Sequence, residues 1–464
     1  MTFSKRHCDQ GASCCFWGVV MSSRCIRSWL LACTAVSAVC VASVEANAGA
    51  FAIREQSVYG QGASFAGIAA GGALSSMFWN PSTITQFAGK NIEFGGAAIF
   101  PHAEHSYSSS FLATAIPPLY AKGVDNSGAA ALVPSSYSSF QLSERLWVGM
   151  STSAPFGLSV QFPRTWAGAG YAQDSSIVTY NFSPTVAYKV ADWLSLGAGL
   201  QAQYMKVSYG TLTVPATMNT ADISGRGWGW GFTAGATITP LPGTTIGIGY
   251  RSAIDQKIDG SLESSTALPA TTTGPVNLTL NLPDSVTVGL RQRLSDRWTG
   301  LAGFEWTNWS RIGTTRLMSP NGAATLGGTA IVFPFNYSDG YFYSLGAEYM
   351  YDPALIFRAG IAFEKSPITD NVRTPRLPDN DRMWYSVGAT YKPAQLRGLT
   401  FDAAYSFIDV KSTPIDISAA SGNPWLNGTG TYTGSVKSQI HILSLALRYQ
   451  WGVEQAVAVK KITK

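Results

Sequence analysis

Runs of about ten residues that alternate in polarity recur along most of the chain, and they constrain its fold more than any other feature. The clearest run, residues 442–451, has apolar side chains at Leu443, Leu445, Leu447, Tyr449 and Trp451 and small or polar ones at Ser444, Ala446, Arg448 and Gln450. Period-two alternation indicates a β-strand whose two faces meet different surroundings. Strands are expected at 91–100, 132–142, 145–153, 177–190, 193–208, 227–239, 243–252, 283–293, 296–308, 340–351, 354–364, 382–392, 398–410 and 438–451.

The connections between these expected strands alternate strictly in length. After the first strand, connections of roughly 17–31 residues alternate with connections of roughly 2–5 residues. Short turns at one rim and long loops at the other are typical of a transmembrane β-barrel, whereas a soluble β-sandwich has no reason to sort its loops in this way. The sequence therefore predicts an all-β protein, a transmembrane antiparallel β-barrel of about 14 strands. Alternation without the loop lengths would leave a soluble all-β protein as the alternative.

The composition agrees with a barrel and excludes several other classes. Only 13% of the residues are charged, and the chain has 14 Trp, 20 Tyr and 22 Phe, which excludes a disordered protein. An apolar run of the length that a membrane helix needs occurs only near the N-terminus, so a bundle of membrane helices is excluded as well. The net charge of +5 is small for 464 residues and does not indicate nucleic-acid binding.

The N-terminal region has the features of an export signal. Basic residues Arg24 and Arg27 precede the mostly apolar stretch 29–44, and small residues follow up to Ala48. This order is typical of a secretory signal peptide, so residues 1–48 are expected to be removed, with Met21 as a start that gives the usual signal length. An uncleaved membrane anchor is the alternative. All six cysteines lie in this region, at Cys8, Cys14, Cys15, Cys25, Cys33 and Cys40. The exported chain is therefore expected to have no disulfide and no cysteine-ligated metal.

Residues 49–89 contain many small residues and no period-two pattern. They also contain large apolar residues, which a solvated arm would not favour: Phe51, Ile53, Tyr59, Phe65, Ile68, Met77, Phe78 and Trp79. A barrel of fourteen strands encloses more space than its own side chains fill. We therefore expect residues 49–89 to fold inside the lumen as an N-terminal hatch, with a disordered periplasmic arm as the alternative. Residues 90–451 are expected to form the barrel and residues 452–464 a periplasmic tail.

Several long motifs resemble the FadL-type transporters of the Gram-negative outer membrane, the FadL/TodX family. They are GAFAIREQSVYGQGASFAG, Trp79-Asn80-Pro81, APFGLSVQF followed by Trp166, SPTVAYKVADWLSLGAGLQAQY, LPDSVTVGLRQRLSDRWTGLAGFEWTNWSRI and RTPRLPDNDRMWYSVGATYK. The resemblance covers essentially the whole mature chain and implies a fourteen-stranded barrel with an N-terminal hatch. Two departures from the family pattern are Ser82, where the family usually has Ala after Asn-Pro, and the 13 residues after Trp451, where these barrels usually end on an aromatic residue.

The resemblance also implies a function. Members take up long-chain fatty acids or similar hydrophobic molecules passively, by capture in an apolar groove of the extracellular loops, transfer to a lumen pocket and release gated by the hatch. An aromatic-hydrocarbon channel of the same fold is the first alternative, and a general diffusion porin is the second. The expected partners are these hydrophobic small molecules, outer-membrane lipid and lipopolysaccharide, and the barrel-assembly machinery. A monomer in the cell outer membrane is expected, with no nucleic-acid partner.

Candidate site residues come from the expected hatch and from inward-facing arginines. The hatch candidates for substrate binding or gating are Phe78, Trp79, Asn80 and Pro81. Pro81 would supply a rigid turn and Asn80 local hydrogen bonds, and a purely structural turn is the alternative. Strand parity places four arginines on the inward face, and they are Arg251, Arg291, Arg358 and Arg448. Each is a candidate partner for a fatty acid carboxylate, or else for the inward carboxylates of Glu305 and Glu348.

The sequence does not indicate an enzyme. After processing, the only histidines are His102, His105 and His441, and no Gly-x-Ser-x-Gly motif accompanies them. The pair His102-x-x-His105 has no carboxylate at a metal-site spacing. No Gly-x-x-x-x-Gly-Lys loop is present, so transport is expected to be passive. No catalytic residue, metal or cofactor is expected.

Overall fold

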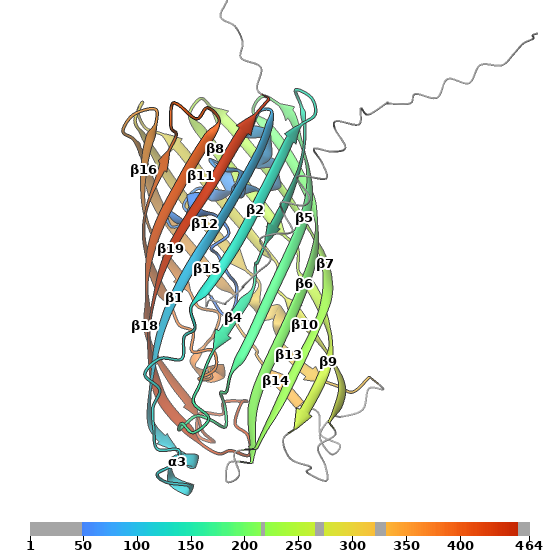
Figure 1. Cartoon of the computed structure of the whole chain (residues 1–464), viewed down its shortest axis with the longest axis vertical. Helices are drawn as coiled ribbons and strands as arrows, with labels where there is room; N and C mark the ends of the chain where they lie inside the picture. The colour runs from blue at the N-terminus through green and yellow to red at the C-terminus, as the bar shows by residue number, and fades with distance from the viewer. Residues whose placement is uncertain (1–48, 215–218, 265–272, 321–330, 453–464) are drawn as a thin grey trace, which may run out of the picture. The chain divides into compact units, whose positions relative to one another are not determined.

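A computed structural model describes residues 49–214, 219–264, 273–320 and 331–452 (Figure 1). All of them belong to the unit Ser43–Lys464. Seventeen strands form one antiparallel sheet: β1 (Lys90–Ser110), β2 (Ala131–Gln141), β3 (Leu146–Ser153), β4 (Gly157–Val160), β5 (Ser175–Ala191), β6 (Leu194–Val214), β7 (Asn219–Leu241), β8 (Thr244–Arg251), β9 (Ile254–Ser264), β10 (Gly274–Leu282), β11 (Ser285–Arg293), β12 (Trp298–Thr307), β15 (Gly340–Met350), β16 (Leu355–Lys365), β17 (Arg382–Tyr391), β18 (Leu399–Ile417) and β19 (Tyr432–Trp451).

The sheet closes on itself because β1 pairs with both β2 and β19. In three places, two consecutive strands follow one course of the wall. β3 and β4 both pair with β5, β8 and β9 both pair with β7, and β10 and β11 pair with β9 and β8 respectively. Seventeen strands less these three continuations leave fourteen courses. The predicted fold, an antiparallel β-barrel of about 14 strands, is confirmed.

The two faces of the wall follow the predicted alternation. In β19 the side chains of Leu443 and Leu445 are 54% and 64% exposed on the outside, whereas Ser444 between them is 1% exposed. An apolar outer face and a polar inner face are what a barrel needs when lipid surrounds it. No helix among the described residues is both long and apolar enough to cross a membrane.

Several strands extend further toward the long-loop end than predicted. β1 continues to Ser110, where the alternation predicted an end at residue 100, and β19 begins at Tyr432, where it predicted residue 438. The added part of β1, PHAEHSYSSS, contains Tyr107 as its only large apolar residue, so its period-two signal is weak. The backbone pairing with β19 continues regardless of side-chain polarity.

The N-terminal segment, residues 49–89, lies inside the ring of strands, toward the end with the short turns (blue in Figure 1). It forms α2 (Val58–Gln61) and three short 3₁₀ helices, η1 (Ile68–Ala70), η2 (Leu74–Phe78) and η3 (Pro81–Gln86). These helices contact the wall on different sides: α2 meets β17, β18 and β19, η1 meets β8 and β11, η2 meets β1, β2 and β3, and η3 meets β5, β6 and β7. All eight large apolar residues named above for this segment are buried.

Glycines of the wall make room for this segment. A Cβ atom on Gly247 or Gly249 of β8 would lie 1.8 Å from the carbonyl oxygen of Ala69 or of Trp79. A Cβ atom on Gly360 of β16 would lie 2.2 Å from the carbonyl oxygen of Ala63. Only glycine lets two backbones approach so closely. The backbone of the N-terminal segment therefore rests directly on the backbone of the barrel wall.

The long-loop end carries the remaining elements. They are α3 (Phe111–Ala115), η5 (Trp309–Ile312), η6 (Asp370–Val372) and the hairpin of β13 (Thr314–Leu317) with β14 (Ile331–Pro334). The predicted signal peptide, residues 1–48, lies outside the described residues, and so does the predicted tail beyond Gly452.

Candidate functional site

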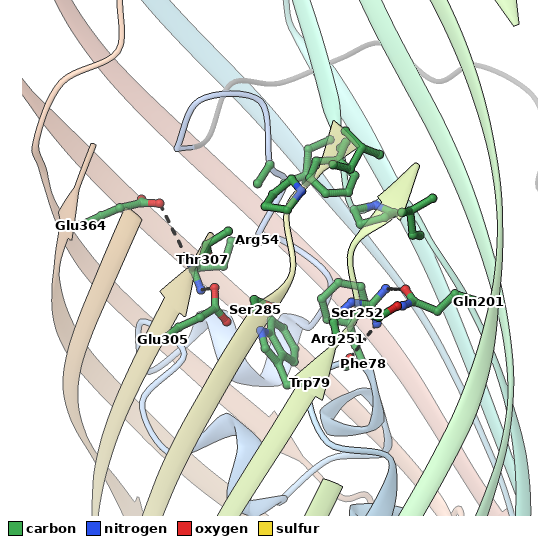
Figure 2. A pocket seen from close by; sticks show the side chains of 17 residues that line it. Arg54, Phe78, Trp79, Gln201, Arg251, Ser252, Ser285, Glu305, Thr307 and Glu364 are labelled. Atoms are coloured by element: carbon green, nitrogen blue, oxygen red, sulfur yellow. Dashed lines mark hydrogen bonds and ion pairs between the residues drawn. The ribbon is translucent and has the colours of Figure 1, made fainter. Parts of the chain in front are cut away.

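A cavity lies in the lumen between the N-terminal segment and the inner wall (Figure 2). Its empty volume is about 670 Å³, counted with its open side. Pockets that bind small molecules combine a mostly apolar lining with a few polar groups. The apolar lining here consists mainly of Ile53, Phe78, Trp79, Phe156, Ile254 and Leu282. The charged lining consists of Arg54, Arg251, Glu305 and Glu364.

The apolar lining is supported by aromatic contacts on two sides. Trp79 meets Phe78 edge-on with ring centroids 4.8 Å apart. Phe156 meets Phe51 and Trp309 at 6.0 and 6.1 Å, and Phe51 meets Trp309 at 4.9 Å. Such tilted and edge-on pairs hold large rings in fixed orientations. The apolar sides of the cavity are therefore packed aromatic side chains that come from both the segment and the loops.

Arg251, at the end of β8, reaches into the cavity from the wall. Its Nη1 donates to the carbonyl oxygen of Phe78 at 2.8 Å, and its Nη2 donates to Oε1 of Gln201. The guanidinium also lies 4.0 Å from the ring centre of Phe78. Among the described residues, no Asp or Glu forms an ion pair with Arg251. Its positive charge is therefore held only by neutral oxygen atoms and an aromatic face.

Arg54 is the second cation of the cavity, and it is paired. It lies on the N-terminal segment, with Nη1 2.9 Å from Glu305 and Nη2 3.7 Å from Glu364. Its guanidinium lies 3.8 Å from the ring centre of Phe342. In the view of Figure 2, this ion-pair group and Arg251 lie on opposite sides of Trp79. Both acids of the cavity are thus bound to the segment rather than to Arg251.

Glu55, next in the segment, is 4% exposed. Burial raises the pKa of its carboxyl group to about 7, and the neighbouring Glu364 adds to the rise while Arg54 and Arg382 oppose it. Its Oε2 atom has no hydrogen-bond partner among the described residues. The carboxyl group of Glu55 is therefore mostly neutral below about pH 7.

The predicted hatch candidates fall into two groups. Phe78 and Trp79 line the cavity beside Arg251. Asn80 and Pro81 do not line it; Asn80 caps η3, and Pro81 occupies the first turn of that helix. The geometry of Asn80 and Pro81 is that of a structural turn, the alternative that the sequence analysis gave for them.

Asn80 fastens the N-terminal segment to the wall. Its Nδ2 atom donates to the carbonyl oxygens of Ala69 and Ala236, at 2.7 and 2.9 Å, and to Oγ1 of Thr237 at 3.2 Å. Its Oδ1 atom accepts from the backbone N–H of Ser82 at 3.1 Å. The Ser82 hydroxyl lies 2.7 Å from Thr237 Oγ1, a hydrogen bond that the alanine usual in the family could not form. The departure at Ser82 therefore adds a contact to the wall.

The three other predicted arginines lie away from this cavity, and they are Arg291, Arg358 and Arg448. Arg291 and Arg358 bind Glu348 at 2.6 and 2.8 Å, and Arg448 binds Asp402 at 2.6 Å. The hydroxyl of Tyr59, from the N-terminal segment, donates to Glu348 and accepts from Arg291. These three arginines are therefore paired with inward carboxylates, which was the alternative to contact with a ligand.

Sequence reasoning did not identify Arg54, Gln201 or Glu364. A signal for Arg54 was present, since Arg54 and Glu55 are the only charged residues between 49 and 89. A charge inside an otherwise uncharged, buried segment needs a partner. Gln201 and Glu364 gave no such signal, because inward polar residues are common in every strand of a barrel. No group of three or more His, Cys, Asp or Glu residues in the described chain could hold a metal ion.

Comparison with known proteins identifies the family. The model of the family described as outer membrane protein transport protein (OMPP1/FadL/TodX) matches residues 39–451. The chain belongs to this family. It is therefore an outer-membrane β-barrel of a Gram-negative bacterium and a transport protein, not an enzyme, and the resemblance to the FadL/TodX family is confirmed.

Curated relatives match over nearly their whole length. The long-chain fatty acid transport protein of Escherichia coli K12 is 26% identical over 440 residues, which cover 84% of this chain and 96% of the relative. Outer membrane protein P1 of Haemophilus influenzae is 26% identical over 455 residues, which cover 88% and 97%.

Solved structures share the fold. A Pseudomonas aeruginosa FadL homologue has a TM-score of 0.77 at 23% identity and covers 87% of this chain and 100% of its own. The P. putida toluene transporter TodX has a TM-score of 0.58 at 16% identity, with 82% and 94% covered. At these identities the likeness concerns the fold alone.

Proposed function

We propose that this FadL/TodX family member takes up long-chain fatty acids or similar amphipathic molecules passively across the outer membrane. The observation that supports this proposal is the lumen cavity, in which an apolar lining ends at Arg251, which has no acidic partner within the described parts of the chain. A fatty acid has the same two parts, because its chain avoids water and its carboxylate binds a guanidinium well. The fatty acid transport proteins among the relatives support the same substrate class.

Capture takes place at the long-loop end, which we take to face the cell exterior. Two side chains of the first long loop, Phe111 and Leu119, are 53% and 37% exposed. Their neighbours Leu112 and Tyr120 are buried within the loops and support them. Exposed apolar side chains on a buried apolar base suit reversible binding of a greasy molecule.

The N-terminal segment acts as the hatch in this proposal, and release proceeds sideways. Ile53 and Phe156 line the lumen cavity and also a second, smaller hollow at the break between β3 and β4. Leu132, which is 46% exposed on the outer face, lines this second hollow. The break is closed by the segment, because Ile53 N–H donates to Pro155 and Gln56 accepts from Ala154. Movement of residues 53–56 would join the two hollows.

Equilibrium binding to the detergent-purified mature protein tests this function. We expect oleate to bind, and Arg251→Met to weaken its binding by roughly 10- to 100-fold, the loss of one charged hydrogen-bonding partner. Arg311→Met serves as the control, because Arg311 lies outside the cavity on η5. Binding of toluene without oleate would favour the hydrocarbon alternative. Binding of neither, with a large open conductance in planar bilayers, would favour a diffusion porin.

A further inference from the structure

Gln201 fixes the position of Arg251. Gln201 lies on β6 with its side chain 1% exposed, and its Oε1 atom accepts a hydrogen bond from Arg251 Nη2. Its other amide atom, Nε2, donates to the carbonyl oxygen of Phe232 at 2.9 Å. Because an amide has one accepting and one donating atom, the bond to Phe232 determines which atom faces Arg251. The guanidinium is therefore held by a neutral acceptor of fixed orientation.

The neutrality of this acceptor distinguishes Arg251 from every other predicted arginine. Arg291 and Arg358 each bind the carboxylate of Glu348, and Arg448 binds Asp402. In the cavity itself, Glu305 is occupied by Arg54 and by the hydroxyl of Thr287 at 2.7 Å. Glu364 is occupied by Arg54 and by Trp384 Nε1 at 3.0 Å. Arg251 thus brings a full positive charge to the cavity wall.

We propose that Gln201 is a positioning residue that determines the charge specificity of the cavity. It holds Arg251 without neutralising it, so the cavity selects apolar chains that end in an anionic group over neutral molecules of the same shape. This inference rests on the proposed function, because it assumes that the cavity binds the cargo. It adds the residue that separates acids from neutral compounds.

Exchange of the amide for a carboxylate should reverse this selection. Gln201→Glu keeps the size of the side chain and lets an acid bind Arg251 within the wall. Arg251 would then form a paired ion in the low-dielectric lumen, and a ligand carboxylate would meet an occupied partner. The carbonyl oxygen of Phe232 loses the amide donor but still accepts from the backbone N–H of Ser252 at 2.9 Å. The change therefore alters the charge of the site with little change of its shape.

The experiment measures the dissociation constants of oleate and of oleyl alcohol, its neutral counterpart, for the detergent-purified mature protein. The wild type is expected to prefer oleate. Gln201→Glu is expected to weaken oleate binding by roughly 10- to 100-fold and to leave oleyl alcohol binding unchanged. Gln201→Met removes the hydrogen bond but not the charge of Arg251, so it is expected to weaken oleate binding less while oleate remains preferred.

Gln203→Glu is the matched control. Gln203 is the next inward residue of β6 and is equally buried, but its amide bonds Asn181 and Gln256 rather than Arg251. It is expected to leave the preference for oleate intact, and circular dichroism checks that each variant keeps its barrel. The inference is wrong if Gln201→Glu keeps the preference, or if Gln203→Glu abolishes it equally. If the wild type binds neither compound, the proposed function itself is wrong.

Discussion

Replacement of Asn80 by alanine is expected to loosen the N-terminal segment from the wall without unfolding the barrel. The change leaves the carbonyl oxygens of Ala69 and Ala236 without the amide donor. Each buried polar group that loses its partner costs about 1–3 kcal/mol. Hydrogen exchange followed by mass spectrometry should show faster exchange in residues 49–89. Ser82→Ala, which removes one hydroxyl contact to Thr237, should give a smaller increase. Equal exchange in Asn80→Ala and the wild type would contradict this role.

Individual residues also mark the limit of the sequence reasoning. The alternation of side chains along the strands predicted four inward arginines as equal candidates for binding a carboxylate. Which of them binds an acidic side chain instead depends on the neighbouring Asp and Glu residues. Glu348 lies opposite Arg358 in the register of β15 and β16, and Glu305 is drawn to Arg54 of the segment. The first pairing follows from strand register, whereas the second depends on how a segment without periodicity folds. The unpaired state of Arg251 therefore could not be derived from the sequence.

At the scale of elements, the glycines of the wall give the next prediction. Gly247→Val adds a side chain where a Cβ atom would lie 1.8 Å from the carbonyl oxygen of Ala69. Valine suits a β-strand, so the barrel should form and the segment should shift instead. Conductance of the purified protein in planar bilayers is expected to exceed that of the wild type. Gly274→Val is the control, because a Cβ atom there meets nothing within 4 Å. If Gly247→Val has the same conductance as the control, the close contact between β8 and the N-terminal segment is not needed to keep the lumen closed.

The elements themselves were predictable where the membrane imposes a pattern. Lipid outside and a polar lumen inside force alternation, which identified all fourteen courses of the wall. Beyond the membrane the strands lose this constraint, which explains why the polar end of β1 was expected to be loop. Two whole strands, β9 and β10, were not predicted, because residues 253–282 were expected to form a long loop. The predicted strands end at residues 252 and 283, next to the short breaks 252–253 and 283–284, but β9 and β10 continue the wall beyond these breaks.

At the scale of the whole molecule, the barrel and the segment differ in what holds them. The wall is a closed ladder of backbone pairs, with no free edge along the joined β1 and β19. The segment is held by side-chain contacts such as Arg54 with Glu305, Tyr59 with Glu348 and Asn80 with Thr237, and by single backbone bonds such as that of Ile53 with Pro155. Conditions that change these charges should therefore move the segment before they affect the barrel.

The pH dependence of the segment follows from Glu55. Its pKa is raised to about 7 in the packed segment, compared with 4.5 for an ordinary glutamate, because burial disfavours the charged form. Between these values the packed state holds a proton that the released state does not, so packing weakens as pH rises from about 4.5 to 7. The difference of 2.5 pKa units corresponds to about 3 kcal/mol at alkaline pH. Hydrogen exchange of residues 49–89 should therefore be faster at pH 8 than at pH 5 after correction for the intrinsic rate. Glu55→Gln, which stays neutral, should remove most of this difference. If the variant shows the same pH dependence as the wild type, a group other than Glu55 controls the packing of the segment against the wall.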